Sequence, residues 1–412
     1  LKILSHIEAK IDFPDEDLPK NIISEIKKTS NNVLKEIKKT LNDQKVGERI
    51  REGFKIAIVG PTNSDLLYLG TELGLFISLD RGDRWVELRN NLPLAAINDL
   101  VVHPRDNDLV LGTHGRGIWI LDNLSALQEL TPEVLAADTH LAGIPDAEMI
   151  RYTRAHAHAG DMIFRGKNPA AGALIDYYLK EPAAKDAIQL AIHDAAGTLI
   201  RDLAPDSTAG INRMVWDLRY PRLPAAPVDA LNIDHTLIRT RNPSPDGPSG
   251  PWVTPGLYTA RLTVNGRTHS RTFIVDEDPR INLQVEQRRR WTDTLLEIAD
   301  LYTLLAADNT GIQPVIWQVE KYRKENKKLD ENAAIKIEET GRLYSELFSR
   351  VRSLYSHVSG WPGPLTTDQH SQWAYYQDMY ESFISLKEDF NKKHLPRLNK
   401  KLAKEDRIAT GL

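Results

Sequence analysis

Cysteine is absent from this sequence of 412 residues. Its absence excludes disulfides, thiolate zinc sites, iron–sulfur clusters and cysteine nucleophiles. No run of about 18 or more apolar residues occurs, so no transmembrane helix is predicted. The charges are balanced, with 53 Lys and Arg against 57 Asp and Glu and a net charge of −4. Such a chain has no general attraction for nucleic acid or anionic membranes, and neither is expected as a partner.

An export signal is also missing from the N-terminal stretch "LKILSHIEAKIDFPDEDL". Charged residues interrupt it before the apolar core of a signal peptide could form. The sequence begins at Leu1 and has its first methionine at Met149. We therefore expect a fragment or a processed piece, and its cellular compartment stays open.

The composition that remains is ordinary for folded protein, with 41% apolar and 27% charged residues. The length allows two to four domains. Lysine and arginine are unevenly distributed: residues 1–64 contain 10 Lys and 2 Arg, residues 65–290 contain 3 Lys and 21 Arg, and residues 291–412 contain 11 Lys and 6 Arg. This switch favours a boundary near residue 64.

A short apolar strand is predicted at 54–59, and "GPTNS" follows it. A phosphate-binding loop opens in this way and continues with Gly, Lys and then Ser or Thr. The next residues here are Asp65, Leu66 and Leu67. Asp65 would repel a phosphate, Leu66 supplies no cation and Leu67 has no hydroxyl for magnesium. Nucleotide hydrolysis is therefore not expected, and an ordinary turn after the strand is the favoured interpretation.

The first 64 residues resemble one protein family. "LSHIEAKIDFPDEDL" comes first, an amphipathic Lys-rich helical region at 18–51 follows, and "REGFKIAIVGPTNS" comes last. In this order they resemble tRNA-modification GTPases of the MnmE/TrmE type, in which a helical domain leads into a GTPase domain. The resemblance implies a bacterial or organellar protein of the cytoplasm that acts on the wobble uridine of tRNA.

Much of what that family uses is missing from this chain. The sequence lacks the P-loop Lys and Ser or Thr, the rest of the GTPase domain, the folate-binding N-terminal domain and the C-terminal cysteine. Of the family's nucleotide site only Gly60 and Asn63 carry over, as a remnant that the resemblance does not make active.

A second pattern starts at residue 65 and repeats. "DLLYLGTELGLFISLD" (65–80) aligns with "DLVLGTHGRGIWILD" (108–122) at an offset of 42 residues. This offset is the length of a β-propeller blade, and the alternation predicts strands joined by tight turns. About one and a half blades are expected.

The turn after the first copy, "SLDRGDRW", has the spacing S-x-D-x-G-x-x-W. We expect the Asp80 carboxylate to accept backbone N–H bonds and Ser78 to close the same turn. Gly82 is expected to adopt a positive φ, and Trp85 to cover the hairpin. These four residues are assigned a structural role.

This turn resembles the Asp-box or BNR repeat of sialidases and sortilin-type receptors. Residues 65–412 resemble the C-terminal part of bacterial secreted proteins with sortilin-type propellers, which are often labelled glycosyl hydrolases. The resemblance is carried by "GTHGRGIWILDNLSALQELTPEV", "GINRMVWDLRYP", "GPWVTPGLYTARLTV" and "DPRINL". It implies an exported protein in which a propeller face binds carbohydrate or peptide.

The predicted fold is therefore multidomain and mixed. Its expected parts are N-terminal helices with a broken P-loop strand (1–64), a partial β-propeller (65–140), an immunoglobulin- or fibronectin-like antiparallel β-sandwich (160–280) with a Pro-rich insertion (220–252), and a C-terminal helical hairpin or bundle (281–412). The sandwich is predicted from alternating strands separated by turn signals such as Asn265-Gly266.

Helical periodicity returns in the C-terminal tail, with helices expected at 283–307, 331–358 and 367–391. Thr366 and Gln369 have the spacing of a capping box, which predicts where the last helix begins. Three aromatic residues of the tail have the spacing of a buried stripe along a helix: Trp373, Tyr376 and Tyr380. Core packing is favoured over a ligand platform.

No catalytic residue, cofactor or metal site is assigned. A glycosidase needs two carboxyl groups about 5–10 Å apart, but the aspartates of the propeller-like segment all fit turn or strand-edge roles. His156 and His158 have a metal-ligand spacing without a third ligand, so a linker is favoured. His114 and Arg116, between two strands, are the candidate ligand-facing residues, with plain turn residues as the alternative.

These patterns predict a chimera joined at Ser64/Asp65, which is a genuine fusion, a pseudogene product or a sequence-assembly join. The leading hypothesis is a non-catalytic remnant or binding module of a sortilin-type propeller protein, with a protein or glycan partner. One alternative is an MnmE-like, tRNA-modification GTPase-related protein with a defective nucleotide site; another is a carbohydrate-active hydrolase. Activity as an enzyme is not expected. Unpaired strand edges predict local instability before about residue 125 unless a partner or dimer covers them.

Overall fold

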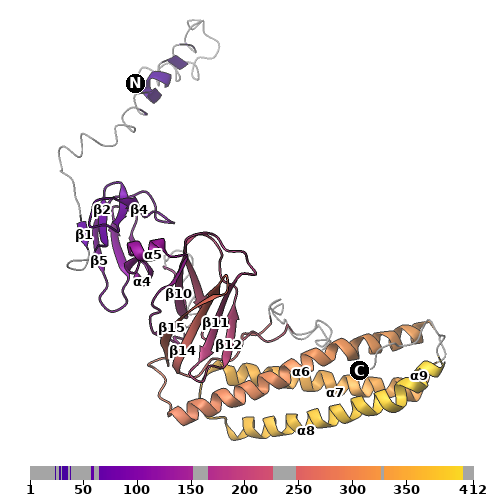
Figure 1. The fold of residues 1–412 in the computed structure, drawn as a ribbon. Coiled ribbons are helices and arrows are strands. Elements are labelled where there is room, and N and C mark those ends of the chain that lie inside the picture. The colour runs from indigo at the N-terminus through magenta and orange to yellow at the C-terminus, as the bar shows by residue number, and fades with distance from the viewer. Residues whose placement is uncertain are drawn as a thin grey trace, which may run out of the picture. The chain divides into compact units, whose positions relative to one another are not determined.

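The computed structural model describes residues 24, 27–28, 30–35, 38, 57–59, 65–151, 166–225, 247–325 and 329–401. The chain forms two compact units, Leu1–Leu124 and Ser125–Leu412. Both helices and several small sheets are present, as predicted for a mixed, multidomain fold (Figure 1). Of the predicted N-terminal helical region, residues 30–35 are helical, and most of the rest lies outside the described residues.

The first unit contains two small antiparallel sheets. One has the order β1-β2-β3-β4 and the other the order β5-β6-β7. Their strands are β1 (Ala57–Val59), β2 (Leu67–Thr71), β3 (Gly74–Ser78), β4 (Val86–Glu87), β5 (Ile97–Val102), β6 (Leu109–Thr113) and β7 (Ile118–Leu121). The 65–80 and 108–122 repeats correspond to the hairpins β2–β3 and β6–β7.

The two hairpins resemble each other because their turns use the same chemistry. In the first, Thr71 Oγ1 donates to the Gly74 carbonyl oxygen at 3.0 Å. In the second, Thr113 Oγ1 donates to the Gly117 carbonyl oxygen at 2.5 Å. Gly74 and Gly117 both have positive φ, at 130° and 77°, which a side chain would disfavour. The sequence repeat therefore reflects local turn geometry.

The partial propeller of about one and a half blades is not confirmed. The described residues of the first unit form one four-stranded and one three-stranded sheet, whereas a propeller is a closed ring of about four to eight sheets of four strands each. The 42-residue repeat encodes two hairpins, and the same Thr and Gly turn signals serve any antiparallel pair.

The second unit begins with two short helices and two further sheets. The sheet orders are β13-β10-β8 and β12-β11-β14-β15-β9. The elements are α4 (Ser125–Gln128), α5 (Pro132–Ala136), β8 (Thr139–Leu141), β9 (Ala147–Glu148), β10 (Ala173–Leu179), β11 (Ile188–Asp194), β12 (Leu199–Leu203), β13 (Gly210–Trp216), β14 (Gly256–Val264) and β15 (Arg267–Asp276). Asn265 and Gly266 make the β14–β15 turn with φ of 49° and 80°, as their pairing predicts.

These two sheets share one apolar core. Alternate residues of β10 and of β14 are buried, so each strand turns one face inward. Trp216 is fully buried, with its ring centroid 5.3 Å from that of Tyr258 and 6.0 Å from that of Phe273. Aromatic contacts between strands of both sheets therefore hold this part together.

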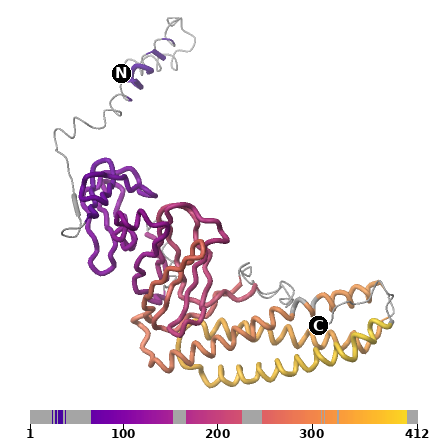
Figure 2. The backbone as a smooth tube through the Cα atoms, viewed as in Figure 1, coloured from indigo at the N-terminus to yellow at the C-terminus, as the bar shows by residue number. Residues whose placement is uncertain are grey.

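Three long helices follow, and they run alongside one another (Figures 1 and 2). They are α6 (Val285–Lys324), α7 (Glu331–Gly360) and α8 (Thr367–Asp389), continued by the π-helix η2 (Phe390–His394) and by α9 (Leu395–Lys401). Within the described ranges none of the helices is both long enough and apolar enough to cross a membrane.

Helix α6 continues well beyond the end predicted at residue 307. It passes through Pro314, which is exposed. Ile312, Val315 and Val319 are fully buried and extend the apolar face of the helix into a second core cluster. Burial of this face outweighs the cost of about 3 kcal/mol that a proline imposes inside a helix.

The capping box predicted at the start of α8 is confirmed. Gln369 N–H donates to Thr366 Oγ1 at 3.2 Å, and Thr366 N–H donates to Gln369 Oε1 at 2.9 Å. The buried stripe on this helix is confirmed as well: Trp373 and Tyr376 are 8% and 6% exposed, and Tyr380 packs against the same cluster. Of the Pro-rich insertion, 226–246 lies outside the described residues.

Candidate functional site

The segment that was compared with a phosphate loop lies between two paired strands. β1 and β2 are antiparallel, with Ala57 opposite Gly70 and Val59 opposite Tyr68. A phosphate loop instead leads from a strand into a helix, whose N-terminal N–H groups bind the phosphates. The chain here returns as the antiparallel strand β2, in the place where a phosphate loop would lead into its helix. Gly60 and Asn63 lie outside the described residues.

The residues after the loop serve the first unit's own packing. The Asp65 carboxylate forms an ion pair with Arg81, and Arg81 N–H donates to the Asp65 carbonyl oxygen at 2.9 Å. Leu66 is 5% exposed, and Leu67 begins β2. An acidic side chain would repel a nucleotide's phosphates, and the two leucines supply neither the cation nor the hydroxyl that the phosphate-loop motif provides.

The turn from Ser78 to Trp85 is held by its own side chains. Ser78 Oγ accepts from Gly82 N–H at 2.8 Å, and Asp80 Oδ1 accepts from Arg84 N–H and from the Ser78 hydroxyl, both at 2.8 Å. These bonds, that from the Arg84 N–H foremost, lower the pKa of Asp80. Gly82 has φ of 101° and lies against the Trp85 ring. The Ser78 and Asp80 side chains thus form hydrogen bonds within the turn itself.

The structure places His114 and Arg116 on the exposed turn between β6 and β7. His114 N–H donates to the Ala96 carbonyl oxygen at 2.8 Å, and the Arg116 carbonyl oxygen accepts from Trp119 Nε1 at 3.0 Å. These contacts use backbone atoms and fix the shape of the turn. They do not bring the two side chains together around a ligand.

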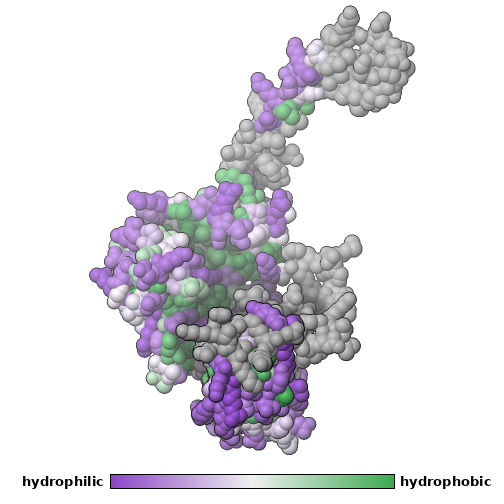
Figure 3. Space-filling view, turned by 90° about the vertical axis from the view of Figure 1, so that its right-hand side faces the viewer, coloured by the Kyte–Doolittle hydropathy of each residue, from purple (hydrophilic) through white to green (hydrophobic). Residues whose placement is uncertain are grey.

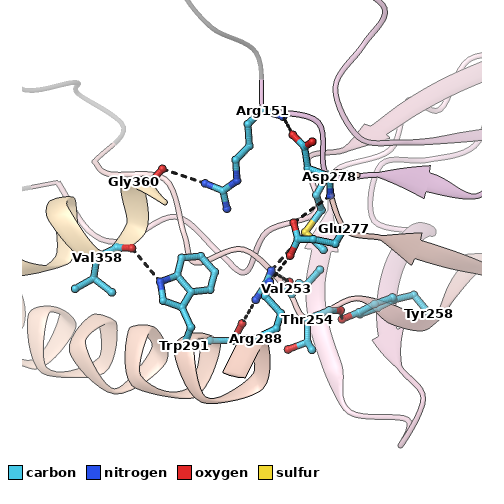
Figure 4. Close-up of polar contacts among 12 residues, drawn as sticks. Arg151, Val253, Thr254, Tyr258, Glu277, Asp278, Arg288, Trp291, Val358 and Gly360 are labelled. Carbon is cyan, nitrogen blue, oxygen red and sulfur yellow. Dashed lines mark hydrogen bonds and ion pairs between the residues drawn. The ribbon is translucent and has the colours of Figure 1, made fainter. Parts of the chain in front are cut away.

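A cluster of arginines and tryptophans lies in the second unit, where the sheets meet the helices (Figure 4). We call it the Arg–Trp cluster. Its members come from the segments after β9, β13 and β15, from α6 and from the end of α7: Arg151, Arg219, Trp252, Glu277, Asp278, Arg280, Arg288, Trp291 and Trp361.

Arg288 is the buried centre of the Arg–Trp cluster, with 3% of its surface exposed. It forms an ion pair with Glu277, and its Nη2 donates to the Val253 carbonyl oxygen at 2.8 Å. Its guanidinium lies 4.6 Å from the centroid of the Trp291 ring, whose Nε1 donates to the Val358 carbonyl oxygen at 3.0 Å. These contacts tie α6 to the sheets and to the end of α7 (Figure 4).

Arg151 lies among three tryptophan rings. Its guanidinium carbon is 5.1 Å from the ring centroid of Trp252 and 5.8 Å from those of Trp291 and Trp361. Nη1 donates to the Gly360 carbonyl oxygen at 3.1 Å, whereas Nε and Nη2 are buried without a hydrogen-bond partner. The negative faces of the rings compensate these N–H groups in part. Burial lowers the pKa of Arg151.

Asp278 is the fully buried carboxylate of the Arg–Trp cluster. It forms an ion pair with Arg280 and accepts from the backbone N–H groups of Arg151 and Arg280, both at 3.0 Å. The side-chain bonds from Arg280 are the main cause of a lowered pKa for Asp278, and the backbone bonds add to it. Burial lowers the pKa of Arg219 to about 10, so it remains protonated near neutral pH.

The charges of the Arg–Trp cluster are therefore engaged with one another and with backbone carbonyls. It contains no nucleophile, and its buried groups hold segments together. Sequence reasoning missed it, although Arg288 precedes Trp291 by three residues in "RRRW". That short pattern fits a cation–π contact, but only the fold brings segments from 151 to 361 together.

A histidine–carboxylate pair lies elsewhere in the second unit. His140 Nε2 is 2.6 Å from Glu129 Oε2, and Gly143 N–H donates to Glu129 Oε1 at 2.7 Å. Arg271 Nη2 lies 3.7 Å from the same carboxylate. The pair can exchange a proton, but no hydroxyl nucleophile contacts it among the interactions described. It therefore lacks part of what nucleophilic catalysis requires.

Metal binding has no support in the part of the chain that the structure describes. There, no group of three or more His, Cys, Asp or Glu side chains could hold an ion. His156 and His158 lie outside the described residues.

Comparison with known proteins relates the chain to one family. The model of the MnmE helical domain matches residues 1–405. A tRNA modification GTPase MnmE of Pelagibacter ubique is 77% identical over 64 residues, which are 16% of this chain and 14% of that protein. Those of Rickettsia rickettsii and Neorickettsia sennetsu are 49% and 48% identical over 63 residues, which are 15% of this chain and 14% and 12% of theirs.

The chain thus spans about one seventh of the length of the curated relatives it matches. Among solved structures, CopC from Methylosinus trichosporium matches 27% of this chain and 80% of its own, with a TM-score of 0.15 and 13% identity. A likeness at that level carries no argument about fold or function.

These comparisons overturn the leading functional hypothesis. The matching family model runs across the expected junction at Ser64/Asp65, and the matched relatives described are all MnmE proteins. Sortilin-type, BNR, Asp-box and glycosyl-hydrolase relationships have no support. The motif misled because S-x-D-x-G-x-x-W describes a turn closed by its own side chains, and such a turn identifies no ligand and no reaction.

Proposed function

Since the chain belongs to the MnmE helical domain family, we propose that it is a tRNA-modification GTPase-related protein whose own nucleotide site is defective. The relatives that it matches are named tRNA modification GTPases. In this proposal the chain contributes to tRNA modification as a helical scaffold that acts through protein contacts, and it does not hydrolyse GTP.

One observation carries the proposal of a defective site. β1 and β2 pair as antiparallel neighbours on either side of the loop. A phosphate cradle needs a helix N-terminus after the loop, and a Lys and a Ser or Thr at its start. This chain has a strand there, and Asp65, Leu66 and Leu67 are in place of the three motif residues.

The helical part of the proposal rests on α6, α7 and α8. Their shared core contains Tyr302, Tyr344 and Phe348, all fully buried. Helix α7 begins at a capped position, where Asp330 Oδ1 accepts from Ala333 N–H at 3.2 Å. A bundle with its own core and caps suits a scaffold, since it needs no ligand to keep its shape.

A finer description of the fold belongs to the same proposal. We propose that the sheets β13-β10-β8 and β12-β11-β14-β15-β9 are the two layers of an immunoglobulin- or fibronectin-like β-sandwich. Their shared apolar core and antiparallel pairing support this description. The range 160–280 expected for the sandwich contains six of these strands, β10 to β15, whereas β8 and β9 precede it.

Titration with a fluorescent GTP analogue tests the nucleotide site. The full chain is expected to show no saturable binding at micromolar concentration. The triple variant D65G/L66K/L67S restores the letters of the phosphate-loop motif, and it too is expected not to bind because the hairpin provides no helix. Micromolar binding by the unaltered chain would refute the proposed defect.

Binding by the triple variant alone would have a different meaning. It would show that the side chains, and not the hairpin backbone, cause the defect. Circular dichroism of each variant confirms that the fold is retained, which matters because Leu66 is buried.

Loss of the gene tests the link to tRNA modification. Nucleosides from the total tRNA of a deletion strain, measured by mass spectrometry, are expected to show a decrease in at least one modified uridine. Complementation with the full chain is expected to restore it. An unchanged nucleoside profile in the deletion strain would contradict the proposal.

A further inference from the structure

The turn between β14 and β15 contains Asn265 and Gly266, the only Asn-Gly pair in the sequence. Val264 pairs with Arg267, so these two residues make up the whole loop of the hairpin. Both are exposed, and their φ values of 49° and 80° are those of a type I′ turn. The fold therefore places a side-chain amide next to a glycine N–H at the exposed tip of a hairpin.

Hydrogen bonds leave the two neighbouring groups of this turn open. Asn265 N–H donates to the Ala187 carbonyl oxygen at 2.9 Å. Neither the Asn265 side-chain amide nor the Gly266 N–H forms a hydrogen bond with another residue that the structure describes. Glycine also has no Cβ that would hinder an approach to its own nitrogen. The barriers to a reaction between the two groups are thus low.

We propose that Asn265 is a site of spontaneous deamidation, in which the backbone nitrogen of Gly266 is the nucleophile. This nitrogen attacks Cγ of Asn265, so that an N–Cγ bond forms and the Cγ–Nδ2 bond breaks. The proton lost by the Gly266 nitrogen leaves with the amide group as ammonia. Water then opens the cyclic imide at either of its two carbonyls, which gives aspartate or isoaspartate.

The water and the new charge of the product both find room at this turn. Hydrophilic side chains cover much of the molecular surface seen in Figure 3, and Asn265 lies on the wall of an open hollow in the second unit. The other charged or imidazole groups of the wall come from the segment before β8, from the end of β10 and from β15: Asp138, Lys180, Glu181, Arg267 and His269. Deamidation therefore adds a carboxylate to a hollow that already contains cations.

The new carboxylate would change the electrostatics of His269. Its pKa is lowered by burial and then by three cationic neighbours, His140, Arg271 and Arg267. A carboxylate at position 265, on the wall of the same hollow, favours the protonated imidazole. Deamidation is therefore expected to raise the pKa of His269.

The two products differ in their effect on the hairpin. Aspartate fits the turn, because Asp-Gly also forms type I′ turns. Isoaspartate carries the main chain through its Cβ and so lengthens a loop whose length fixes the register of the strands. Nine residue pairs join β14 and β15. The isoaspartate form is therefore expected to unfold at a lower urea concentration than the aspartate form.

Peptide mass spectrometry of the folded full chain, after incubation in mildly alkaline buffer, tests the site. Trypsin releases residues 262–267 as one peptide, in which conversion of the amide to the acid is read as a gain in mass. Asn90 is the internal control, because it is exposed and has a positive φ of 37°, but Asn91 follows it. Asn265 is expected to react at least about tenfold faster than Asn90, since only glycine leaves its nitrogen unhindered.

Equal rates at the two asparagines overturn the proposal. An Asn265 amide that survives in the folded chain but is lost in the urea-unfolded chain overturns it as well, because the turn would then protect the amide. An isoaspartate-specific carboxyl methyltransferase identifies the second product, and aspartate without any isoaspartate would contradict the cyclic intermediate.

Gly266→Ala tests the nucleophile. The added Cβ is expected to slow deamidation at Asn265 at least about tenfold. Measurement in the urea-unfolded chain separates this effect from the strain that alanine causes in the turn, because no turn is present there. An unchanged rate in urea would show that the Gly266 nitrogen does not attack.

Asn265→Asp imitates one product and tests the effect on the hollow. Titration followed by nuclear magnetic resonance is expected to give a higher pKa for His269 in this variant than in the unaltered chain. Thr272→Asp is the control, because it adds the same charge to β15 on the opposite face from His269. Equal shifts in the two variants, or none in Asn265→Asp, would contradict the proposed entry of the charge into the hollow. None of these outcomes depends on GTP or tRNA.

Discussion

Gly172 lies at a position where the fold leaves no room for a side chain. It has φ of 138°, and a Cβ there would lie 2.1 Å from the Trp216 carbonyl oxygen. Gly172→Ala is therefore expected to destabilise the second unit by about 3 kcal/mol or more, because the clash is with backbone and cannot be relieved by a rotamer. Urea denaturation measures the loss.

Gly197→Ala is the matched control for this change. Gly197 also has a positive φ, of 82°, but no atom lies within 4 Å of the position of its Cβ. Gly197→Ala is expected to lower the unfolding free energy by only about 1 kcal/mol, because alanine disfavours a positive φ. Equal losses at both glycines would show that φ, and not the contact with Trp216, sets the cost.

The buried carboxylate of Asp278 makes stability depend on pH. Its pKa is lower in the folded chain than in the unfolded one, where it is about 3.9. The ionised group therefore stabilises the fold at pH above about 4, and this contribution is lost as the pH falls toward the folded-state value. Asp278→Asn is expected to flatten the decrease in unfolding free energy between pH 6 and pH 3.

Asp138→Asn is the control for the substitution itself, because the Asp138 side chain is 80% exposed and its ion pair with Arg267 is a surface pair. It is expected to change the unfolding free energy by less than about 1 kcal/mol. If Asp278→Asn lowers the unfolding free energy equally at every pH in that range, the ionised and the neutral Asp278 carboxyl stabilise the fold to the same extent. The prediction would then be wrong.

At the scale of the element, Gly341 sets how closely α6 and α7 approach. A Cβ at this position would lie 2.4 Å from Cδ1 of Ile316. Gly341→Leu is expected to cost about 1–3 kcal/mol by overpacking, even though leucine favours helix more than glycine does. Arg342→Leu adds the same side chain at the neighbouring exposed position and should change the denaturation midpoint little.

Elements whose signals are local could be predicted from the sequence. The capping box at Thr366 and the β2–β3 and β6–β7 hairpins follow from short-range chemistry. Helix α6 could not be bounded in this way, because Gly311 and Pro314 suggest an end that burial of Ile312 and Val315 overrides. The Arg–Trp cluster was missed for a related reason, since it joins segments that are distant in sequence.

At the scale of the whole molecule, the two units differ in how much core they contain. The buried apolar residues of the first unit lie in two small sheets, whereas the second unit has three apolar clusters. Calorimetry is expected to show two transitions, with the first unit unfolding at the lower temperature, because a small core stabilises less. Gly172→Ala should lower only the second transition.

A single transition whose calorimetric and van't Hoff enthalpies agree would contradict two independent units. At this scale sequence reasoning failed most clearly. Repeated hairpins suggested a partial propeller of about one and a half blades, because repetition along the chain does not reveal whether the sheets belong to a ring.

Burial of the tryptophans has an optical consequence. Trp216 and Trp291 are 0% and 2% exposed, whereas Trp85 and Trp119 of the first unit are half-buried. Indole emission moves to longer wavelength as water reaches the ring. The folded chain should therefore emit as a sum of a blue component from the buried rings of the second unit and a redder one from the half-buried rings of the first unit and from Trp317 and Trp361, which are 56% and 60% exposed. Iodide should quench the red component selectively. The colour of the emission therefore reports how far water reaches the tryptophan rings, without any added label.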